Sequence, residues 1–192
     1  VPANADGLVL FAHGSGSSRF SRRNRYVAEV LQDAGFATLL FDLLTPGEDE
    51  VDATTRQYRF DIPLLASRLT GAIDWSQQQD AVAGSAVGLF GASTGAAAAL
   101  IAAADRPDRV RAVVSRGGRA DLAGAALARV RCPTLLLVGS EDAPVIDLNE
   151  TARQALAGPV ELHIIRGAGH LFEERGKLEE VARQAAEWFS WH

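Results

Sequence analysis

The 192 residues are 47% hydrophobic and 22% charged, which is enough apolar material for one sizeable core and is typical of a single globular domain. The formal net charge of −5 and the lack of a long Lys/Arg cluster exclude a typical nucleic-acid-binding face. The single cysteine, Cys132, excludes an internal disulfide and any metal site built from several thiolates.

No apolar run reaches the roughly 18 residues that a membrane-spanning helix needs. The longest, GAAAALIAAAD (95–105), ends at the charged stretch RPDR. We therefore expect no membrane partner and, with one cysteine, a cytoplasmic location by default. The chain begins at Val1 without the basic and apolar stretches of a secretion signal, so we expect an N-terminus that was processed or cut from a longer chain.

Six mostly continuous apolar runs follow one another along the chain and are typical of strands with both faces buried. They are GLVLFAHG (7–14), ATLLFDLL (37–44), AVGLFGAS (86–93), RAVVSRGG (111–118), TLLLVGSED (134–142) and VELHIIRGAG (160–169). Helical periodicity lies between and after them. It is clearest over 178–189, and over 60–75 it has Pro63 in the first turn.

Six strands alternating with about five helices predict an α/β fold with a mainly parallel, doubly wound sheet, because parallel neighbours need crossover connections. No linker, repeat or low-complexity segment divides the chain, so we expect one domain over 1–192.

Ligands of such sheets bind beyond the carboxyl ends of the strands, where this chain places a serine, an acid and a histidine. Ser93 lies in GASTG after the third run, Asp142 in GSED after the fifth and His170 in GAGH after the sixth. Gly91 and Gly95 would give the close clearance that a serine needs at a tight strand-to-helix turn. These observations predict Ser93 as a nucleophile rather than a chance match to G-x-S-x-G.

His170 is the candidate general base because it lies in a glycine-rich loop, which we expect to be mobile. The other histidines are His13 in HGSG, His163 within a strand pattern and His192 at the end of the sequence, and we expect the His163 imidazole to meet a polar partner. For the acid, Asp142 is favoured over Glu141 and over Asp147, which we expect to open or cap the next helix.

The loop HGSGSS after the first run can direct backbone N–H groups at one point. Ser15, with Gly16 second, and the N–H of Thr94 are the predicted oxyanion donors. A phosphate-binding loop is the competing interpretation, but no Gly-Lys-Ser/Thr follows. We expect neither a cofactor nor a metal.

The GASTG stretch and the order Ser93, Asp142, His170 resemble the nucleophile elbow and triad of the α/β-hydrolase superfamily. Within it, FAHGSGSSR, RNRYVAEVL, FDLLTP, GASTGAAAAL, SRGGR and GAGHLFEE resemble a small bacterial group of dienelactone-hydrolase-like proteins over nearly the whole chain. Dienelactone hydrolases proper use a cysteine nucleophile where this chain has Ser93, and Cys132 is expected to be structural.

The resemblance also implies features at the ends and in the connections. The roughly 15 residues between the fourth and fifth runs leave no room for a lid domain. VPANADG (1–7) looks like the tail of the second of the two antiparallel strands with which superfamily members usually begin, so either the sheet is smaller or the chain is trimmed. Some relatives are fused behind a phosphoribosyltransferase domain, which would suit a C-terminal piece.

We expect a serine hydrolase that cleaves small, short-chain carboxylic esters through an acyl-enzyme. The alternatives are a non-catalytic binding module, or a thioesterase or dienelactone-type hydrolase of an anionic substrate. Arg116 and Arg119 in SRGGR are candidates for binding a substrate carboxylate, or else hold loop carboxylates such as Asp121. We expect Arg22, Arg23 and Arg25 to be solvated.

Overall fold

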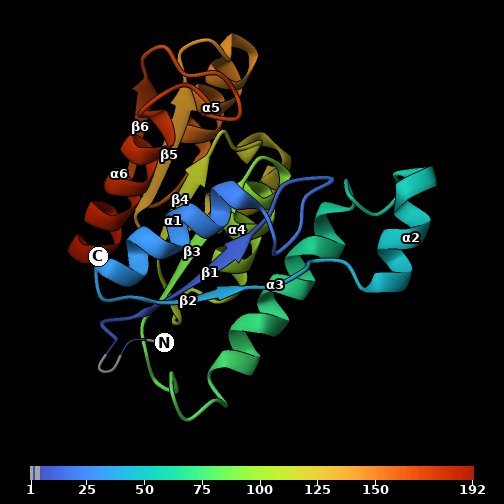
Figure 1. Cartoon of the computed structure of the whole chain (residues 1–192), viewed down its shortest axis with the longest axis vertical. Coiled ribbons are helices and arrows are strands. Elements are labelled where there is room, and N and C mark those ends of the chain that lie inside the picture. The colour runs from blue at the N-terminus through green and yellow to red at the C-terminus, as the bar shows by residue number, and fades with distance from the viewer. Residues whose placement is uncertain (1, 3–4) are drawn as a thin grey trace.

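The computed structural model describes residue 2 and residues 5–192, and its centre is a single parallel sheet (Figure 1). The strands run in the order β2-β1-β3-β4-β5-β6, and every neighbouring pair is parallel. They are β1 (Leu8–Ala12), β2 (Ala37–Leu40), β3 (Val87–Ala92), β4 (Val110–Arg116), β5 (Thr134–Gly139) and β6 (Val160–Ile165). The predicted doubly wound α/β sheet is confirmed.

Helices cover both faces of this sheet, and alternate residues of each strand point to opposite layers. On one face, α1 (Arg22–Asp33) and α6 (Lys177–Trp191) pack on residues such as Val9 and Val114. On the other, the core includes residues such as Leu10 and Val113. That second layer is made of α3 (Ile62–Ser76), α4 (Thr94–Asp105), the 3-10 helix η1 (Ala120–Arg129) and α5 (Ala143–Ala155).

All six predicted strands extend beyond the ends of the observed strands, and the reason is the same in most of them. The fifth and sixth runs were expected over 134–142 and 160–169, but the strands end at Gly139 and Ile165. The glycine, serine and acidic residues that close each run leave the sheet and form the loops at its carboxyl edge. Those loops carry the candidate site.

Helix α2 (Pro46–Thr55) was not expected from the sequence. It lies to one side of the sheet (Figure 1), and Asp52 is its one buried residue. Its start carries a capping box, because Thr45 accepts from the Glu48 N–H while the Glu48 side chain accepts from the Thr45 N–H. The stretch TPGE could have revealed this helix, whereas hydrophobic periodicity could not.

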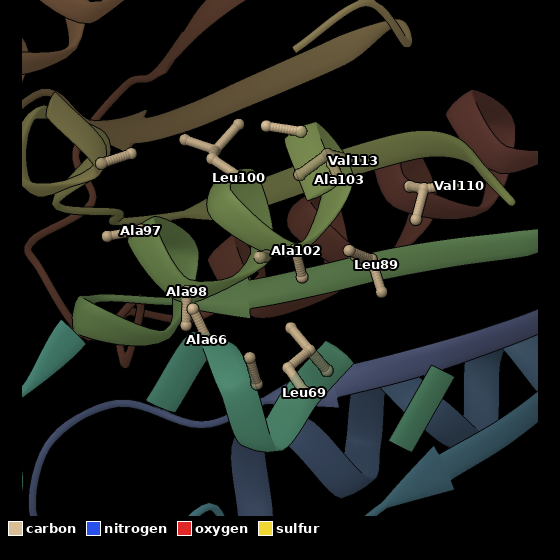
Figure 2. Close-up of a cluster of buried hydrophobic side chains, with 14 of the residues drawn as sticks. Ala66, Leu69, Leu89, Ala97, Ala98, Leu100, Ala102, Ala103, Val110 and Val113 are labelled. Carbon is tan, nitrogen blue, oxygen red and sulfur yellow. The ribbon is translucent and has the colours of Figure 1, made fainter. Parts of the chain in front are cut away.

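Helix α4 is the most deeply buried helix segment of the core and places Ser93 at its start. Its alanines pack against the sheet and α3, as Figure 2 shows for Ala98 beside Ala66 and for Ala102 near Leu89. Small side chains let the helix lie close to β3 and β1. Its N-terminus is thereby fixed at the carboxyl edge of the sheet.

Two expectations about the ends and connections can be compared with the structure. Residues 1, 3 and 4 of the proposed strand remnant VPANADG lie outside the described residues, and residues 2 and 5–7 form no strand. Between β4 and β5 the chain forms only η1, so no lid domain is inserted there, as expected. In the described part of the chain, no helix is both long and apolar enough to cross a membrane.

Replacing Gly95 by alanine should destabilise the fold, because a Cβ there would collide with the backbone carbonyl oxygen of Ala12. We expect the free energy of unfolding in urea to fall by about 2 kcal/mol or more. The matched control is Gly71→Ala in α3, where a Cβ meets no atom within 4 Å. This control should be stabilised by about 0.5–1 kcal/mol. Equal stabilities of the two variants would contradict the close packing of α4 on β1.

Candidate active site

Ser93 occupies a strained turn between β3 and α4. Its backbone has φ 50° and ψ −121°, a conformation that non-glycine residues rarely adopt. The turn is held by two hydrogen bonds to the end of β4 and to the segment after it: Ser93 N–H donates to the Arg116 carbonyl (3.2 Å), and the Ser93 carbonyl accepts from Arg119 N–H (3.0 Å). A Cβ on Gly91 would lie 2.5 Å from the Ala96 Cα. The glycine is therefore needed for the turn, as the sequence predicts.

His170 and Asp142 form a direct hydrogen bond between Nδ1 and Oδ2 of 2.6 Å. Asp142 is the residue before α5, yet its side chain caps no backbone N–H of that helix. The carboxylate is therefore free to accept from the imidazole. With Nδ1 donating to Asp142, Nε2 is left to take up a proton.

Ser93 and His170 line the same cavity of about 210 Å³, although they come from loops 77 residues apart. The cavity lies at the carboxyl edge of the sheet. No hydrogen bond joins the two side chains among the described residues, an arrangement common in enzymes without bound substrate. The structure thus brings the three predicted side chains to one edge.

The His170 loop is anchored rather than mobile, which corrects the expectation from its glycines. Gly167 N–H donates to Ser140 Oγ (2.8 Å), and Gly169 N–H donates to Glu174 Oε1 (3.1 Å). The side chain of Phe172, two residues later, is buried in the core. These contacts fix the loop, so His170 has a defined position beside Asp142.

The competing carboxylates lie elsewhere. Glu141 is exposed and accepts from Ser140 Oγ (2.9 Å). Asp147 lies inside α5, which begins at Ala143, so the expectation that Asp147 opens or caps this helix is wrong. Asp142 occupies that capping position instead.

The predicted oxyanion donors differ in whether they lie beside the Ser93 cavity. Ser15 lines the cavity of Ser93 and His170, whereas Gly16 lines a larger adjoining cavity of about 590 Å³. The N–H groups of Ser15, Gly16 and Thr94 donate to no other described residue, and Thr94 is the first residue of α4. Ser15 and Thr94 are therefore the better placed pair, and Gly16 is the less favoured donor.

His13 holds the Ser15 loop in place, a role that the sequence did not reveal. Its Nδ1 donates to the Gly14 carbonyl (3.0 Å), and its Nε2 accepts from Leu43 N–H (3.1 Å). Burial lowers the pKa of His13 below its ordinary value, which favours this neutral form. The expected polar partners of His163 are Gln184 (2.7 Å) and Glu161 (2.9 Å).

The two candidate arginines have different surroundings. The Arg119 guanidinium makes two hydrogen bonds of 2.8 Å to Asp121 and does not line the Ser93 cavity, so it is no longer a candidate for substrate binding. Arg116 lines the cavity, is only 6% exposed and lies with its guanidinium carbon 6.0 Å from the centre of the Phe172 ring. Burial, with a smaller contribution from the charge of Arg23, lowers the pKa of Arg116 to about 10.

The sequence did not lead us to expect that α1 contributes residues to the Ser93 cavity. Arg22 and Arg25 are exposed as expected, but Arg23 is only partly exposed and lines the Ser93 cavity together with Asn24, so the expectation of a solvated Arg23 holds only in part. Helical spacing could have given a signal, because Asn24 lies on the same face as Val27 and Leu31, which are buried.

Within the described residues, no group of three or more His, Cys, Asp or Glu is arranged to hold a metal. Cys132 lies just before the amino end of β5, away from the edge that carries Ser93, and packs against the core. Burial raises the pKa of its thiol to about 11.

The chain matches the family described as "Alpha/beta hydrolase domain" over residues 5–189. It is 60% identical to the dienelactone hydrolase of Anabaena variabilis, with a TM-score of 0.98, covering 100% of this chain and 89% of that one. It is also 28% identical to the "Probable 2-oxo-3-(5-oxofuran-2-ylidene)propanoate lactonase" of Bradyrhizobium sp, over 85% of this chain and 75% of that protein.

Two proteins of Mycobacterium tuberculosis, each named "Putative phosphoribosyl transferase", are 58% identical over all 192 residues. The match covers 42% of their length, so this chain spans less than half of them. The family match over nearly the whole sequence and the identity with a solved hydrolase show that the chain belongs to the α/β-hydrolase superfamily, in its dienelactone-hydrolase-like family.

Proposed function

We propose that this protein is a serine hydrolase that cleaves small carboxylic esters through an acyl-enzyme. The observation that supports this most strongly is the 2.6 Å hydrogen bond between His170 and Asp142, with His170 lining the same cavity as Ser93. In this arrangement the serine is the nucleophile, the histidine is the general base, and the aspartate is the carboxylate that orients the base.

In the first half of the reaction, Ser93 Oγ attacks the ester carbonyl carbon while His170 Nε2 takes the hydroxyl proton. Asp142 accepts from Nδ1, so its negative charge stabilises the imidazolium. The tetrahedral intermediate then collapses, the bond to the leaving oxygen breaks, and His170 returns the proton to the alcohol. A water molecule repeats the sequence on the acyl-enzyme and releases the acid.

The N–H groups of Ser15 and Thr94 would stabilise the oxyanion of each intermediate. Both are without another acceptor in the described chain, and Thr94 begins α4, whose N-terminus carries a partial positive charge. A donor of this kind lowers the barrier by about 3 kcal/mol. The positive φ of Ser93 is consistent with a turn held in a strained conformation for this purpose.

The names of the relatives support an ester as the bond that is cleaved. One similar structure is named a dienelactone hydrolase and one similar protein a lactonase, and a lactone is a cyclic ester. We therefore include lactones in the proposed substrate class. The transferase name belongs to proteins that extend far beyond the match, and we do not extend it to this chain.

Replacing Ser93 by alanine should reduce kcat/KM for 4-nitrophenyl acetate by at least about a thousandfold, because the nucleophile is lost. A fluorophosphonate should label the unaltered protein at Ser93, as checked by mass spectrometry of peptides. The matched control is Ser67→Ala on the exposed side of α3, which should retain full activity and labelling. Unchanged turnover in Ser93→Ala would remove Ser93 from the mechanism, whereas a lack of turnover by the unaltered protein would favour a binding module.

We expect kcat/KM to decrease as the acyl chain of 4-nitrophenyl esters lengthens from acetate and butyrate to octanoate. The Ser93 cavity holds only about 210 Å³. The lining of the adjoining larger cavity mixes apolar residues such as Leu43 with charged ones, among them Arg59 and Asp49, and these charged groups disfavour a long apolar chain. Initial rates across the series measure this directly. A maximum at octanoate would contradict the small cavity.

Thiol reagents should leave the activity unchanged, because the raised pKa of Cys132 keeps its thiol protonated. At pH 8 a pKa of about 11 leaves on the order of 0.1% thiolate. Ellman's reagent should react slowly with the native protein and rapidly in urea. Inactivation that follows the native thiol reaction would indicate that Cys132 takes part in catalysis.

A further inference from the structure

The three residues that follow β4, the 117–119 segment, contact both the nucleophile and the general base. Gly117 has a φ of 51°, and a Cβ added to it would lie 2.9 Å from the His170 carbonyl oxygen and 3.6 Å from Cε1 of the His170 ring. At the other end of the segment, Arg119 N–H donates to the Ser93 carbonyl (3.0 Å). The position of this segment therefore helps to set the separation of Ser93 and His170.

The side chain of Asn149, in α5, holds the middle of this segment. Its Nδ2 donates to the Gly118 carbonyl and to the Val145 carbonyl, both at 2.8 Å. Val145 lies four residues earlier in the same helix, so the bond to Gly118 is the one that reaches out of α5. Among the described residues, no other side chain forms a hydrogen bond with the backbone of the 117–119 segment.

Packing alone does not account for an asparagine at this place. Asn149 is 0% exposed, yet its Oδ1 accepts from no described residue. Carbonyl groups only accept, so the two that Nδ2 binds force Oδ1 to face the other way. An unsatisfied buried acceptor destabilises a fold, and asparagine forms helices less well than the similarly sized leucine. The other two buried residues of α5, Val145 and Ala152, are apolar.

The same helix is attached to the other half of the candidate site. Asp142 immediately precedes α5 and accepts from His170 Nδ1 (2.6 Å). Asn149 follows Asp142 by seven residues, which is about two helical turns. Helix α5 is thus joined at its start to His170 and further along to the 117–119 segment. Because that segment binds Ser93, the side chain of Asn149 links the two halves of the site.

We propose that Asn149 is a positioning residue for the reaction, and that it holds Ser93 at the distance from His170 that proton transfer requires. The inference rests on the proposed ester hydrolysis and adds a residue that does not touch the substrate. Asn149 lines neither the Ser93 cavity nor the larger adjoining one, so it acts only through the backbone of the 117–119 segment. A misplacement of about 1 Å between reacting groups can slow an enzyme about a hundredfold.

A purely structural role for Asn149 would have a different consequence. If its amide only satisfied the buried Gly118 carbonyl, its loss would lower stability and leave the rate of each folded molecule unchanged. If it positions the segment, the folded variant reacts more slowly but binds the ester nearly as well, because Asn149 lies outside the substrate cavity. Stability and the rate of attack by Ser93 therefore separate the two roles.

The test replaces Asn149 by leucine, which has a similar volume and no hydrogen-bond donor. We expect kcat for 4-nitrophenyl acetate to decrease about tenfold or more, while KM changes by less than about threefold. The second-order rate constant for labelling of Ser93 by a fluorophosphonate should decrease by a similar factor. Labelling needs the same proton transfer as ester cleavage but no release of an acyl group, so it reports the first step alone.

Two further variants identify the contact that matters. A serine hydroxyl in a helix donates to the carbonyl four residues back, so Asn149→Ser keeps a bond to Val145 and loses the one to Gly118. We expect it to lose as much kcat as Asn149→Leu. The matched control, Ala152→Gly, weakens the same buried face of α5 and leaves the Asn149 amide in place. It should unfold at a lower urea concentration and keep its kcat and labelling rate.

If Asn149→Leu does not fold, Asn149→Ala and Asn149→Ser decide the question, with the same decrease expected. Full kcat and full labelling rate in any folded Asn149 variant, or an equal loss in Ala152→Gly, would overturn the inference and leave ester hydrolysis established. Absence of both hydrolysis and labelling in the unaltered protein would instead overturn the proposed function.

Discussion

The close approach of α4 to the sheet is the constraint on which the candidate site depends. Gly95 lies against the backbone of Ala12, and Gly91 lies against Ala96, so neither position has room for a side chain. This contact forces the chain to turn within one residue, and that residue is Ser93 with its positive φ. The strain at Ser93 persists because the packed alanines of α4 and the hydrogen bonds from the end of β4 and the segment after it hold both sides of the turn.

A second constraint fixes the partners of Ser93. The His170 loop is tied to the end of β5 through Ser140 and to its own downstream segment through Glu174. Because β5 and β6 are neighbours, Asp142 and His170 leave the sheet side by side. The parallel order of the sheet thus brings a carboxylate and an imidazole together without any long connection between them.

At the same edge of the sheet, the positive charge of Arg116 has no carboxylate partner among the described residues. Asp142 accepts a hydrogen bond from His170, and Asp121 accepts one from Arg119. Neither carboxylate reaches Arg116, which is buried and forms no ion pair with any residue that the structure describes. Folding thus buries the Arg116 guanidinium at the cavity that also holds the start of α1, at a cost in stability.

The sequence by itself determined the strand-helix alternation, the parallel sheet and the positions of Ser93, Asp142 and His170 at strand ends, because apolar runs and glycines are local signals. It did not reveal α2, whose one buried residue is Asp52, or the anchoring of the His170 loop. The different surroundings of Arg116, Arg119 and Arg23 were decided only by the tertiary structure. Pairing and burial of a charged side chain depend on residues far away in the chain, such as Glu173 for Arg23, and no local pattern records them.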